Sequence, residues 1–357
     1  MKNNRLEEAK ALLKTSGLSH LLISDTVDVA YISGFKSSNA AVLLSKRKNL
    51  LITDFRYKVA ADQFCHANPE WKYEIVKERF YDTIASFIPE ESSVGYQSNF
   101  LTVDNFNDLK KSLKKSSLKS ASKIVSRLYL KKTAPEIDLM RKAAAIGDLA
   151  LEKTLPHIKA GITEIELTRT LERYCSELGS EKPSFDTIVL FGNRAALPHG
   201  KPQNIPLKKG NWILIDFGCT FGGFCSDMTR TFIFGKASEK QKKLYNIVKE
   251  AQSRARAAAR SEITARYLDS IARDYIVQQG YGDMFGHALG HGVGIRIHEQ
   301  PRVSPHVDEL LEESCVVTIE PGIYLEESGG VRIEDMVVLY KDKASVLTHF
   351  PRDLIEL

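Results

Sequence analysis

The 357-residue chain lacks the features that mark secreted, disulfide-linked or membrane-spanning proteins. Its five cysteines are an odd number without C-x-x-C spacing, so reduced thiols are expected rather than a disulfide framework or a structural zinc site. Cys219 and Cys225 flank a Gly-Gly pair and could approach each other, although two buried thiols are the simpler interpretation. No apolar run nears the roughly 20 residues of a membrane span, and the polar first ten residues do not resemble a signal peptide. A cytoplasmic protein without a membrane partner is expected.

The chain also lacks a strong charge of one sign. Its 50 basic and 45 acidic residues leave a net charge of +5, and the excess is most concentrated at residues 110–132. No aromatic interleaving or recognition motif accompanies the lysines there, which favours a solvated helix and linker over a nucleic-acid surface. No nucleic-acid partner is therefore expected.

What the chain does have is enough length and apolar content for two domains, because 357 residues with 43% hydrophobic side chains exceed the usual single-domain size. Residues 1–123 alternate short helical and strand-like patterns, which is typical of a small α/β domain with a mixed sheet. The serine- and lysine-rich residues 110–122 are the best boundary. Residues 124–357 would then form a second domain, and the whole chain would belong to the α/β (α+β) class.

The second domain shows one pattern twice, in which two long helices precede strands joined in hairpins. The first set is expected as helices at 135–157 and 163–178 and strands at 187–191, 212–219 and 224–234. The second set is expected as helices at 239–259 and 263–279 and strands at 285–289, 316–320, 331–339 and 345–348. This order suggests an internal duplication around a pseudo-twofold axis.

Four acids lie in apolar or glycine-rich strand segments, where acids are rare: Asp216, Asp227, Glu320 and Glu334. An ionised carboxylate inside a sheet costs several kcal/mol unless it is paired, so four converging acids require compensating cations. The first pair is 11 residues apart and the second pair 14, and a Gly-Gly dipeptide lies between the members of each. A hairpin in each half can therefore bring its two acids together.

Histidines complete the pattern. His291 lies in a Gly-His-Gly segment, whose glycines permit a close backbone approach. Four carboxylates and one imidazole carry too many charges for one structural zinc and suit two divalent ions that share carboxylates. These ligands favour manganese, cobalt, iron or zinc, and the sequence does not choose among them. His199, His287 and His298 lie near the same motifs and could polarise a carbonyl or carry protons.

Taken together, these motifs resemble the pita-bread metallopeptidase family of aminopeptidase P, prolidase and methionine aminopeptidase. The resemblance covers residues 124–349 and rests on the five ligands in order and on four motifs: Gly290-His-Gly, His298-Glu-Gln-Pro301, Glu320-Pro-Gly and Arg332-Ile-Glu334-Asp. The N-terminal domain resembles the one that Xaa-Pro peptidases carry, and Arg332 looks like the proline-specific branch. The resemblance implies a pseudo-twofold pita-bread catalytic domain with two divalent ions, of which manganese is the first expectation.

The matching motifs also imply a division of roles. Asp216 would bind one ion, His291 and Glu320 the other, and Asp227 and Glu334 would bridge both. A hydroxide held between the ions would attack the scissile carbonyl, and Glu320 would move a proton to the leaving nitrogen. His287 and His298 would stabilise the tetrahedral oxyanion and position the carbonyl, while His199 would line the substrate side.

The implied substrate is a peptide with proline at its second position, bound with its free amine against the site carboxylates. Proline has no amide hydrogen, so a shaped pocket must replace backbone recognition. Tyr324, Phe185 and Phe191 are candidates for that pocket, and Arg332 is a further substrate-binding candidate. Arg302 is a candidate partner for the C-terminal carboxylate of a dipeptide. Homodimers are common in the family, so a homodimer is expected.

Three alternatives remain beside an Xaa-Pro peptidase. Methionine aminopeptidase is disfavoured by the extra domain and by Arg332. A metal-free binding module on the same fold and a creatinase-like enzyme without metal are disfavoured because all five ligands are present. The sequence leaves open whether dipeptides or longer peptides are preferred, which metal is used, and which residue is preferred before proline.

Overall fold

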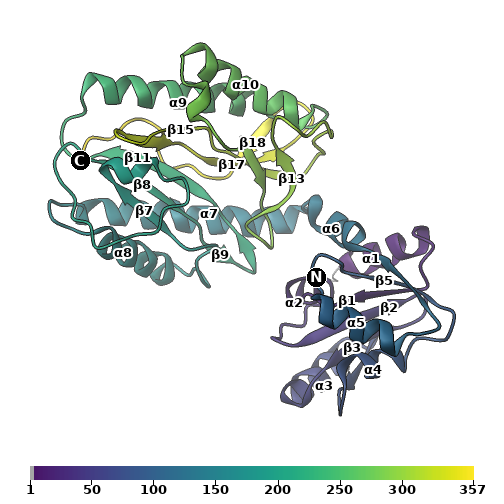
Figure 1. The fold of residues 1–357 in the computed structure, drawn as a ribbon. Coiled ribbons are helices and arrows are strands. Elements are labelled where there is room, and N and C mark those ends of the chain that lie inside the picture. Colours follow the sequence, from purple (N-terminus) through teal and green to yellow (C-terminus); the bar gives the residue numbers. More distant parts are fainter. Residues whose placement is uncertain (1–3) are drawn as a thin grey trace. The chain divides into compact units, whose positions relative to one another are not determined.

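The computed structural model describes residues 4–357, which divide into two compact units between Tyr129 and Leu130 (Figure 1). The division lies near the end of helix α6 (Ser122–Leu130), and the boundary expected from the sequence at residue 123 lies at the start of the same helix. Helices and strands alternate in both units, so the mixed α/β class is confirmed.

The first unit is built on a six-stranded mixed sheet with the order β4-β3-β2-β1-β5-β6. Its strands are β1 (His20–Ile23), β2 (Ala40–Ser45), β3 (Asn49–Thr53), β4 (Trp71–Ile75), β5 (Ser93–Tyr96) and β6 (Ser117–Ser120). The pairs β1/β2 and β2/β3 are antiparallel, whereas β3/β4, β1/β5 and β5/β6 are parallel. Hairpins and crossovers are thus combined in one sheet, as the sequence pattern predicted.

Helices cover both faces of this sheet. They are α1 (Asn4–Thr15), α2 (Thr26–Ser33), η1 (Phe55–Tyr57), α3 (Lys58–Ala67), α4 (Phe80–Ala85), α5 (Val103–Ser112) and α6. Leu21 and Ile23 belong to one apolar core and Leu22 to another, because successive residues of a strand point to opposite faces. The first core includes residues of α1, α2 and α6, and the second includes residues of α4 and α5.

The second unit begins with two helices and a three-stranded antiparallel sheet of order β11-β8-β7. The elements of this half are α7 (Ala134–Thr154), η2 (Leu155–His157), α8 (Glu164–Glu177), β7 (Ile188–Phe191), η3 (Gly192–Ala196), β8 (Trp212–Phe217), β9 (Thr220–Phe221), β10 (Phe224–Cys225) and β11 (Met228–Ile233). The Gly222-Gly223 pair turns the β9/β10 hairpin with φ angles of 59° and 82°. These positive angles explain the two glycines, since residues with a Cβ rarely adopt them.

The second half repeats the order with two helices and a five-stranded sheet, β13-β12-β14-β17-β18. Its elements are α9 (Glu239–Ala258), α10 (Ala265–Gln278), η4 (Gly282–Met284), β12 (Gly290–Gly292), β13 (Glu299–Val303), β14 (Val316–Ile319), β15 (Gly322–Leu325), β16 (Gly329–Arg332), β17 (Asp335–Leu339) and β18 (Ala344–Val346). Strands β15 and β16 form a separate two-stranded sheet. Figure 1 shows α9 and α10 along one side of the strands and α7 and α8 along the other.

Two strand predictions in this half are wrong. Residues 285–289 form no strand, because side chains of α10 take their backbone groups: Arg273 donates to the carbonyl oxygens of Phe285 and His287, and Asp269 accepts from Leu289 N. The single strand expected at 331–339 is broken between β16 and β17. Glu334 lies at this break, and its backbone N–H donates to a different strand, β11.

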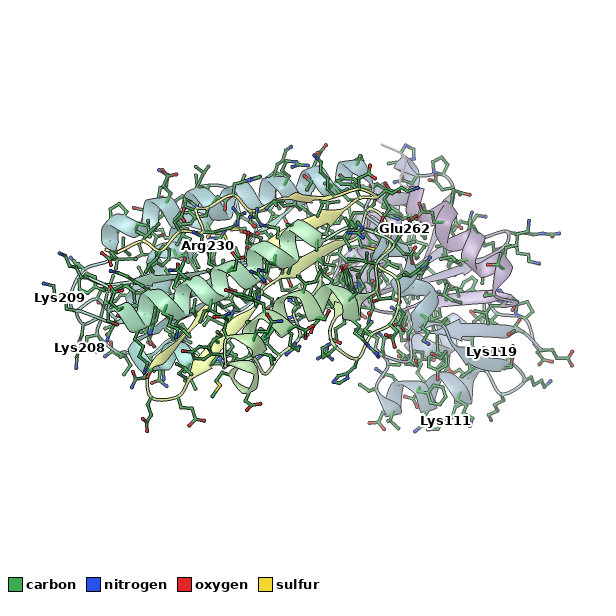
Figure 2. All side chains as sticks on the ribbon, turned by 90° about the horizontal axis from the view of Figure 1, so that it is seen from above. Lys111, Lys119, Lys208, Lys209, Arg230 and Glu262 are labelled. Atoms are coloured by element: carbon green, nitrogen blue, oxygen red, sulfur yellow. The ribbon has the colours of Figure 1, made fainter. Side chains whose placement is uncertain are left out.

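Charged side chains are distributed unevenly between surface and interior. Figure 2 shows Lys111 and Lys119 extending outward from the first unit and Lys208 and Lys209 at one end of the second, whereas Arg230 lies among the strands and helices. Arg230 is only 1% exposed. Across residues 4–357, no helix combines the length and apolar character that crossing a bilayer requires.

Candidate active site

The two halves of the second unit each place one acid at the end of a central strand and one directly before the neighbouring strand. Asp216 lies near the end of β8 and Asp227 immediately before β11, and Glu320 and Glu334 hold the same places relative to β14 and β17. Both strand pairs are antiparallel, with Thr229 opposite Asp216 and Ile319 opposite Asp335. The sequence therefore predicted correctly that paired strands bring the members of each pair together.

Strand alternation aims the first acid at the interior. Trp212 and Leu214 of β8 belong to the apolar core that also contains the strands of the second half, while Ile213 and Ile215 belong to the other core. Asp216 shares the face of Trp212 and Leu214, because residues two apart on a strand point the same way. An acid is thus placed on the face that joins the two halves.

Hydrogen bonds between the halves bring the two acid pairs into one cluster. Glu334 N donates to Thr229 O at 3.1 Å, and Thr229 Oγ1 donates to Glu334 Oε2 at 2.7 Å. Arg332 N lies 3.2 Å from Thr231 Oγ1, which also donates to the Arg332 carbonyl oxygen. Strand β11 is thereby tied to the segment that carries Glu334.

His291 faces this cluster with an unprotonated nitrogen. Its Nδ1 lies 3.1 Å from Gly292 O, and because a carbonyl only accepts, Nδ1 carries the hydrogen and the lone pair is on Nε2. Nε2 lies 3.4 Å from Glu320 Oε1 and 3.6 Å from Asp227 Oδ2. Ligand atoms of Asp227, His291 and Glu334 all lie within 4.8 Å of one another. A lone pair among carboxylate oxygens is the arrangement that a metal ion would satisfy.

Glycines around His291 allow this approach. A Cβ at Gly290 would lie 2.0 Å from the Thr318 carbonyl oxygen, and a Cβ at Gly292 would lie 2.2 Å from the Gln300 carbonyl oxygen. Both contacts are with backbone atoms, which have little room to move. The Gly-His-Gly motif is therefore required by the close packing of β12 against its neighbours.

The cluster carries more negative charge than its protein partners neutralise. Burial, and then the neighbouring acids, raise the pKa of Asp227 and of Glu334 well above their usual values. Burial also raises the pKa of Glu320 to about 8. Asp216 Oδ1 is buried and has no hydrogen-bond partner. Divalent cations would satisfy both the excess charge and this orphaned oxygen, so the residues present fit metal binding.

Arg332 is the main cation that the chain itself supplies here. It is 3% exposed, and its guanidinium donates to Asp216 Oδ2 at 2.7 Å, Tyr324 Oη at 2.8 Å and Thr229 Oγ1 at 3.0 Å. Asp216 thus has one oxygen held by Arg332 and the other left for a cation. These contacts use three of the five guanidinium N–H bonds.

Tyr324 links Arg332 to His287. His287 Nδ1 lies 2.8 Å from Ala288 O and therefore carries the hydrogen, so Nε2 accepts the hydrogen of Tyr324 Oη at 2.9 Å. Burial, and then the charge of Arg332, lower the pKa of His287 to about 4, while burial raises the pKa of Tyr324 to about 12. At neutral pH both groups are uncharged, and both nitrogens of His287 have protein partners.

The other two candidate histidines are solvent-exposed. The His298 ring centroid is 4.4 Å from that of His291, and the two rings meet edge to face. Burial, and then the nearby His291 and His199, lower the pKa of His298. His199 also lowers the pKa of His287. His199 is therefore close enough to both other candidate histidines to affect their charge.

The remaining substrate candidates differ in exposure. Arg302 is exposed and pairs with His291 across the β12/β13 ladder, and cross-strand partners of this kind share a face of the sheet. Phe191 is 2% exposed and packs in the apolar core. Among the aromatic candidates, Phe185 and Tyr324 are the two that keep exposed surface.

Two threonines that the sequence analysis did not single out support the acids. Thr229 donates to Glu334, and Thr318 Oγ1 donates to Glu320 Oε1 at 3.1 Å. Each lies two residues from a cluster acid on the same chain segment, Thr229 after Asp227 and Thr318 before Glu320. A hydroxyl at that spacing shares a strand face with the acid, and this was the available signal.

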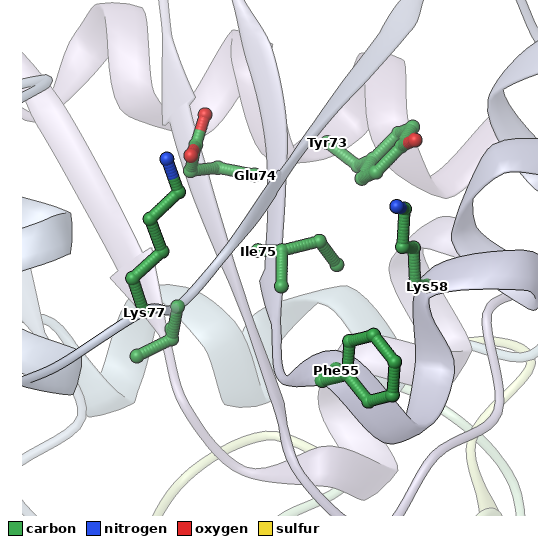
Figure 3. A pocket seen from close by; sticks show the side chains of 7 residues that line it. Phe55, Lys58, Tyr73, Glu74, Ile75 and Lys77 are labelled. Atoms are coloured by element: carbon green, nitrogen blue, oxygen red, sulfur yellow. The ribbon is translucent and has the colours of Figure 1, made fainter.

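The cysteines near the site are free thiols. Cys219 interacts with Cys175 of α8, which raises the pKa of Cys175, rather than with Cys225. An open pocket in the first unit, lined by Phe55, Lys58, Tyr73, Glu74, Ile75, Val76 and Lys77, contains a single acid (Figure 3). It therefore lacks the group of ligands that the acid cluster provides.

Comparisons with known proteins agree with this geometry. The family described as Metallopeptidase family M24 matches residues 138–341, and the Creatinase/Prolidase N-terminal domain matches residues 5–128. The Xaa-Pro dipeptidase of Pyrococcus furiosus is 36% identical over 98% of this chain and 99% of its own length.

Solved structures extend the likeness to the whole fold. An Xaa-Pro dipeptidase from Bacillus anthracis matches with a TM-score of 0.93 at 35% identity, and an X-Pro aminopeptidase from Thermotoga maritima with a TM-score of 0.91 at 35% identity. In each case 99% of both chains is covered. The pita-bread architecture expected of the second unit is confirmed. The chain belongs to metallopeptidase family M24, with a creatinase/prolidase-type N-terminal domain, and is a hydrolytic enzyme.

Proposed function

We propose that the enzyme hydrolyses the bond between an N-terminal residue and proline, in dipeptides or at the start of longer peptides, with two divalent ions. The observation that carries this proposal is the buried acid cluster around His291, with the orphaned Oδ1 of Asp216. The proline specificity is supported by the names of the relatives, which include both dipeptidases and an aminopeptidase.

The ligand assignment follows the cluster. Asp216 would hold one ion, His291 and Glu320 the other, and Asp227 and Glu334 would be shared. Manganese is the first choice, with cobalt, zinc or iron as alternatives. Bound ions would supply Lewis-acid polarisation of the scissile carbonyl and would lower the pKa of water.

The chain's own residues would transfer the proton, stabilise the developing charge and bind the substrate. Glu320, whose Oε1 accepts from Thr318, would carry a proton from water to the leaving nitrogen. His298, exposed beside His291, would donate to the carbonyl oxygen as negative charge develops there. The site carboxylates would bind the free amine of the substrate, and His199 would line the substrate side.

We assign His287 a role other than the oxyanion stabilisation that the resemblance implied. Both of its nitrogens have protein partners, so no N–H remains to donate to an oxyanion. We assign it to orienting Tyr324, whose ring, together with Phe185, would bind the proline ring. Arg332 holds the same tyrosine from the other side and would offer its remaining N–H bonds to the substrate.

Arg302 would decide substrate length. Its exposed guanidinium shares the sheet face of His291 and could pair with the carboxylate that ends a dipeptide. A homodimer and a cytoplasmic location are part of the same proposal, by analogy with the family.

The direct test compares Ala-Pro, Ala-Pro-Ala and Met-Ala-Ser in manganese and in cobalt, with metal content measured by elemental analysis. We expect about two ions per chain and cleavage of an Xaa-Pro substrate that a chelator abolishes. Arg302→Ala should raise KM for Ala-Pro about tenfold or more, while Arg266→Ala, at an exposed pair with Asp308, should not. A chain that holds no metal after reconstitution, or that cleaves only Met-Ala-Ser, contradicts the proposal.

A further inference from the structure

A buried ion pair lies outside the acid cluster, between the first residues of the second unit and strand β13. Lys132 Nζ is 2.8 Å from Glu299 Oε2, and the two side chains are 2% and 0% exposed. Desolvation of two charges offsets most of the gain from their attraction, so such a pair is weak evidence of a stabilising role. The role of the pair is therefore sought in the chain segments that it holds in place.

Glu299 closes a tight turn at residues 293–299. Its Oε1 accepts from Arg296 N at 2.9 Å, and within the turn Gly294 N donates to Arg296 O at 3.0 Å. A Cβ at Gly294 would lie 2.5 Å from Glu299 Oε2 and 2.8 Å from Lys132 Cε. The turn is thus packed directly against the ion pair, with a glycine at the point of contact.

Lys132, the other member of the ion pair, is itself held in place by its backbone. Its backbone N–H donates to Ser314 O at 2.9 Å, on the segment that precedes β14. The Gly294 carbonyl oxygen accepts from Cys225 N at 2.7 Å, close to Asp227. The turn is therefore held from both halves of the second unit, and Lys132 provides the charge at its centre.

The turn ends in His298, the residue directly before Glu299. His298 lies in the bend directly before β13 and is exposed, whereas Glu299, the first residue of β13, has a fully buried side chain. With Glu299 fixed inward, the His298 ring is directed to its position 4.4 Å from the His291 ring. The ion pair thus anchors the residue adjacent to this imidazole.

We propose that Lys132 and Glu299 are positioning residues that hold the His298 imidazole against the substrate carbonyl. This role deepens the function proposed above and rests on it for its catalytic consequence. The two side chains bond to each other, to Leu130 O and to Arg296 N rather than to the cluster acids, so we expect the pair to act through His298. Because the turn also accepts from Cys225 N, near Asp227, metal content distinguishes this route from an effect on the cluster. Its loss would misplace a donor that is needed most when charge develops on the carbonyl oxygen, and would lower kcat more than it changes KM.

The neighbouring Lys131 offers a matched control. It pairs with Glu312 at 2.7 Å, but the two side chains are 53% and 26% exposed. Lys131→Met and Lys132→Met make the same chemical change one residue apart. Only the second removes a charge from beneath the His298 turn.

The experiment measures kcat, KM and metal content of the full chain for Lys132→Met, Lys131→Met, His298→Ala and the double variant Lys132→Met/His298→Ala. We expect Lys132→Met to lower kcat at least tenfold, with KM within threefold and metal content unchanged, and Lys131→Met to match the wild type. In the His298→Ala background, Lys132→Met should cause no further loss. Independent, multiplying losses overturn the proposal, because the pair would then act by another route.

Two further variants and an NMR measurement keep the outcome decisive. If Lys132→Met does not fold, Glu299→Gln replaces it, since the amide oxygen can still accept from Arg296 N. Lys132→Arg should restore most of kcat by keeping the charge. The imidazole NMR signal of His298, in protein with labelled histidine, should shift with Lys132→Met and not with Lys131→Met, whatever the substrate. An unshifted signal overturns the positioning role, whereas a shifted signal in an enzyme inactive on every Xaa-Pro substrate overturns the proposed function alone.

Discussion

Glu334 and Asp335 are neighbours in the sequence, both buried at 2% and 0% exposure, and their surroundings are electrostatically opposite. Asp335 accepts from Arg230 at 2.8 Å, Gln252 at 2.6 Å and Thr348 at 2.9 Å, and also from Arg352. Burial raises its pKa, but the charge of Arg230 and the contacts with Arg352 more than offset this, so the pKa is lowered.

Glu334 lies on the other side of the same chain segment. Thr229 donates to it, but burial and then the charges of Glu320 and Asp216 raise its pKa well above the usual value. The charge of the Arg332 guanidinium lowers the pKa but does not offset them. One carboxylate thus has a complete set of protein partners, while its neighbour requires a cation from outside.

This difference separates a structural acid from a candidate metal ligand by physical criteria alone. A buried carboxylate with two guanidiniums and two neutral donors has its charge neutralised within the fold. A buried carboxylate that faces other carboxylates keeps an unfavourable charge, which only protons or metal ions can remove. Exchanging each acid for its amide should therefore have opposite consequences.

The largest effect is expected for Glu334→Gln. The amide is a poor ligand for a divalent ion, so we expect metal content to fall and kcat/KM to drop at least about a thousandfold, a loss of about 4 kcal/mol in transition-state stabilisation. The metal-free variant should be at least as stable as the metal-free wild type, because one repelling charge is removed.

Elemental analysis, steady-state kinetics and urea unfolding of the chelated proteins check this prediction. Glu326→Gln, at an exposed position after β15, is the matched control and should leave all three unchanged. If Glu334→Gln keeps full metal content, or if it destabilises the metal-free protein by several kcal/mol, Glu334 belongs with the structural acids.

The sequence predicted one member of this comparison and not the other. Apolar flanks and period-2 alternation placed Glu334 at a strand with its side chain inward, and the motif resemblance gave it a role. The same pattern puts Asp335 on the opposite face but does not name its partners. Arg230 lies 105 residues away in sequence, so the pairing depends on how β11 meets β17.

Other gaps in the prediction have the same cause. Residues 285–289 are apolar enough for a strand, yet Asp269 and Arg273 of α10 take their backbone groups. The pair of Lys132 and Glu299 joins residues 167 positions apart. Local patterns predicted the helices, most of the strands and the position of the acids at strand ends, while long-range polar pairing required the structure.

The next largest effect is expected for Asp335→Asn. The amide leaves the Arg230 and Arg352 guanidiniums without their counter-charge, and breaking a buried pair in this way costs about 3–5 kcal/mol. We expect this loss in the free energy of urea unfolding, with unchanged metal content in the fraction that remains folded. A loss below about 1 kcal/mol, or a loss of metal from a stable variant, would place Asp335 with the metal ligands.

A third effect concerns the pH dependence of stability, to which Glu334 and Asp335 should contribute with opposite signs. Because the pKa of Glu334 is raised in the folded state, the metal-free folded chain binds more protons than the unfolded chain, and stability falls as pH rises. Asp227 and Glu320 act in the same direction. Asp335, with its lowered pKa, stabilises the fold above about pH 4 and loses this contribution as pH falls through its folded-state pKa.

The window that isolates the cluster is about pH 7.5 to 8.5, well above the ordinary histidine pKa of 6.5. There the metal-free protein should lose about 1.4 kcal/mol per pH unit for each proton retained, and saturating manganese should remove the slope by replacing those protons. Urea unfolding at about pH 7.5, 8 and 8.5, with chelator and with manganese, measures it. Glu334→Gln should flatten the slope of the metal-free protein, and a flat wild-type slope would contradict the charge imbalance.

The smallest and sharpest contrast uses two buried threonines, Thr229 and Thr348, which are 0% and 1% exposed. Each donates its hydroxyl to one of the two acids, Thr229 to Glu334 and Thr348 to Asp335. Valine replaces threonine at nearly the same volume, so each change removes chiefly the hydrogen bonds of one hydroxyl, which also accepts from Arg332 at Thr229 and from Met336 N at Thr348. Thr348→Val should cost about 1 kcal/mol of stability and leave manganese affinity unchanged.

Thr229→Val should weaken manganese binding about 10- to 100-fold, because the hydroxyl orients a ligand carboxylate and also accepts from Arg332. Isothermal titration with manganese and urea unfolding of both variants separate these outcomes, and equal effects on affinity would mean that the two acids share one network.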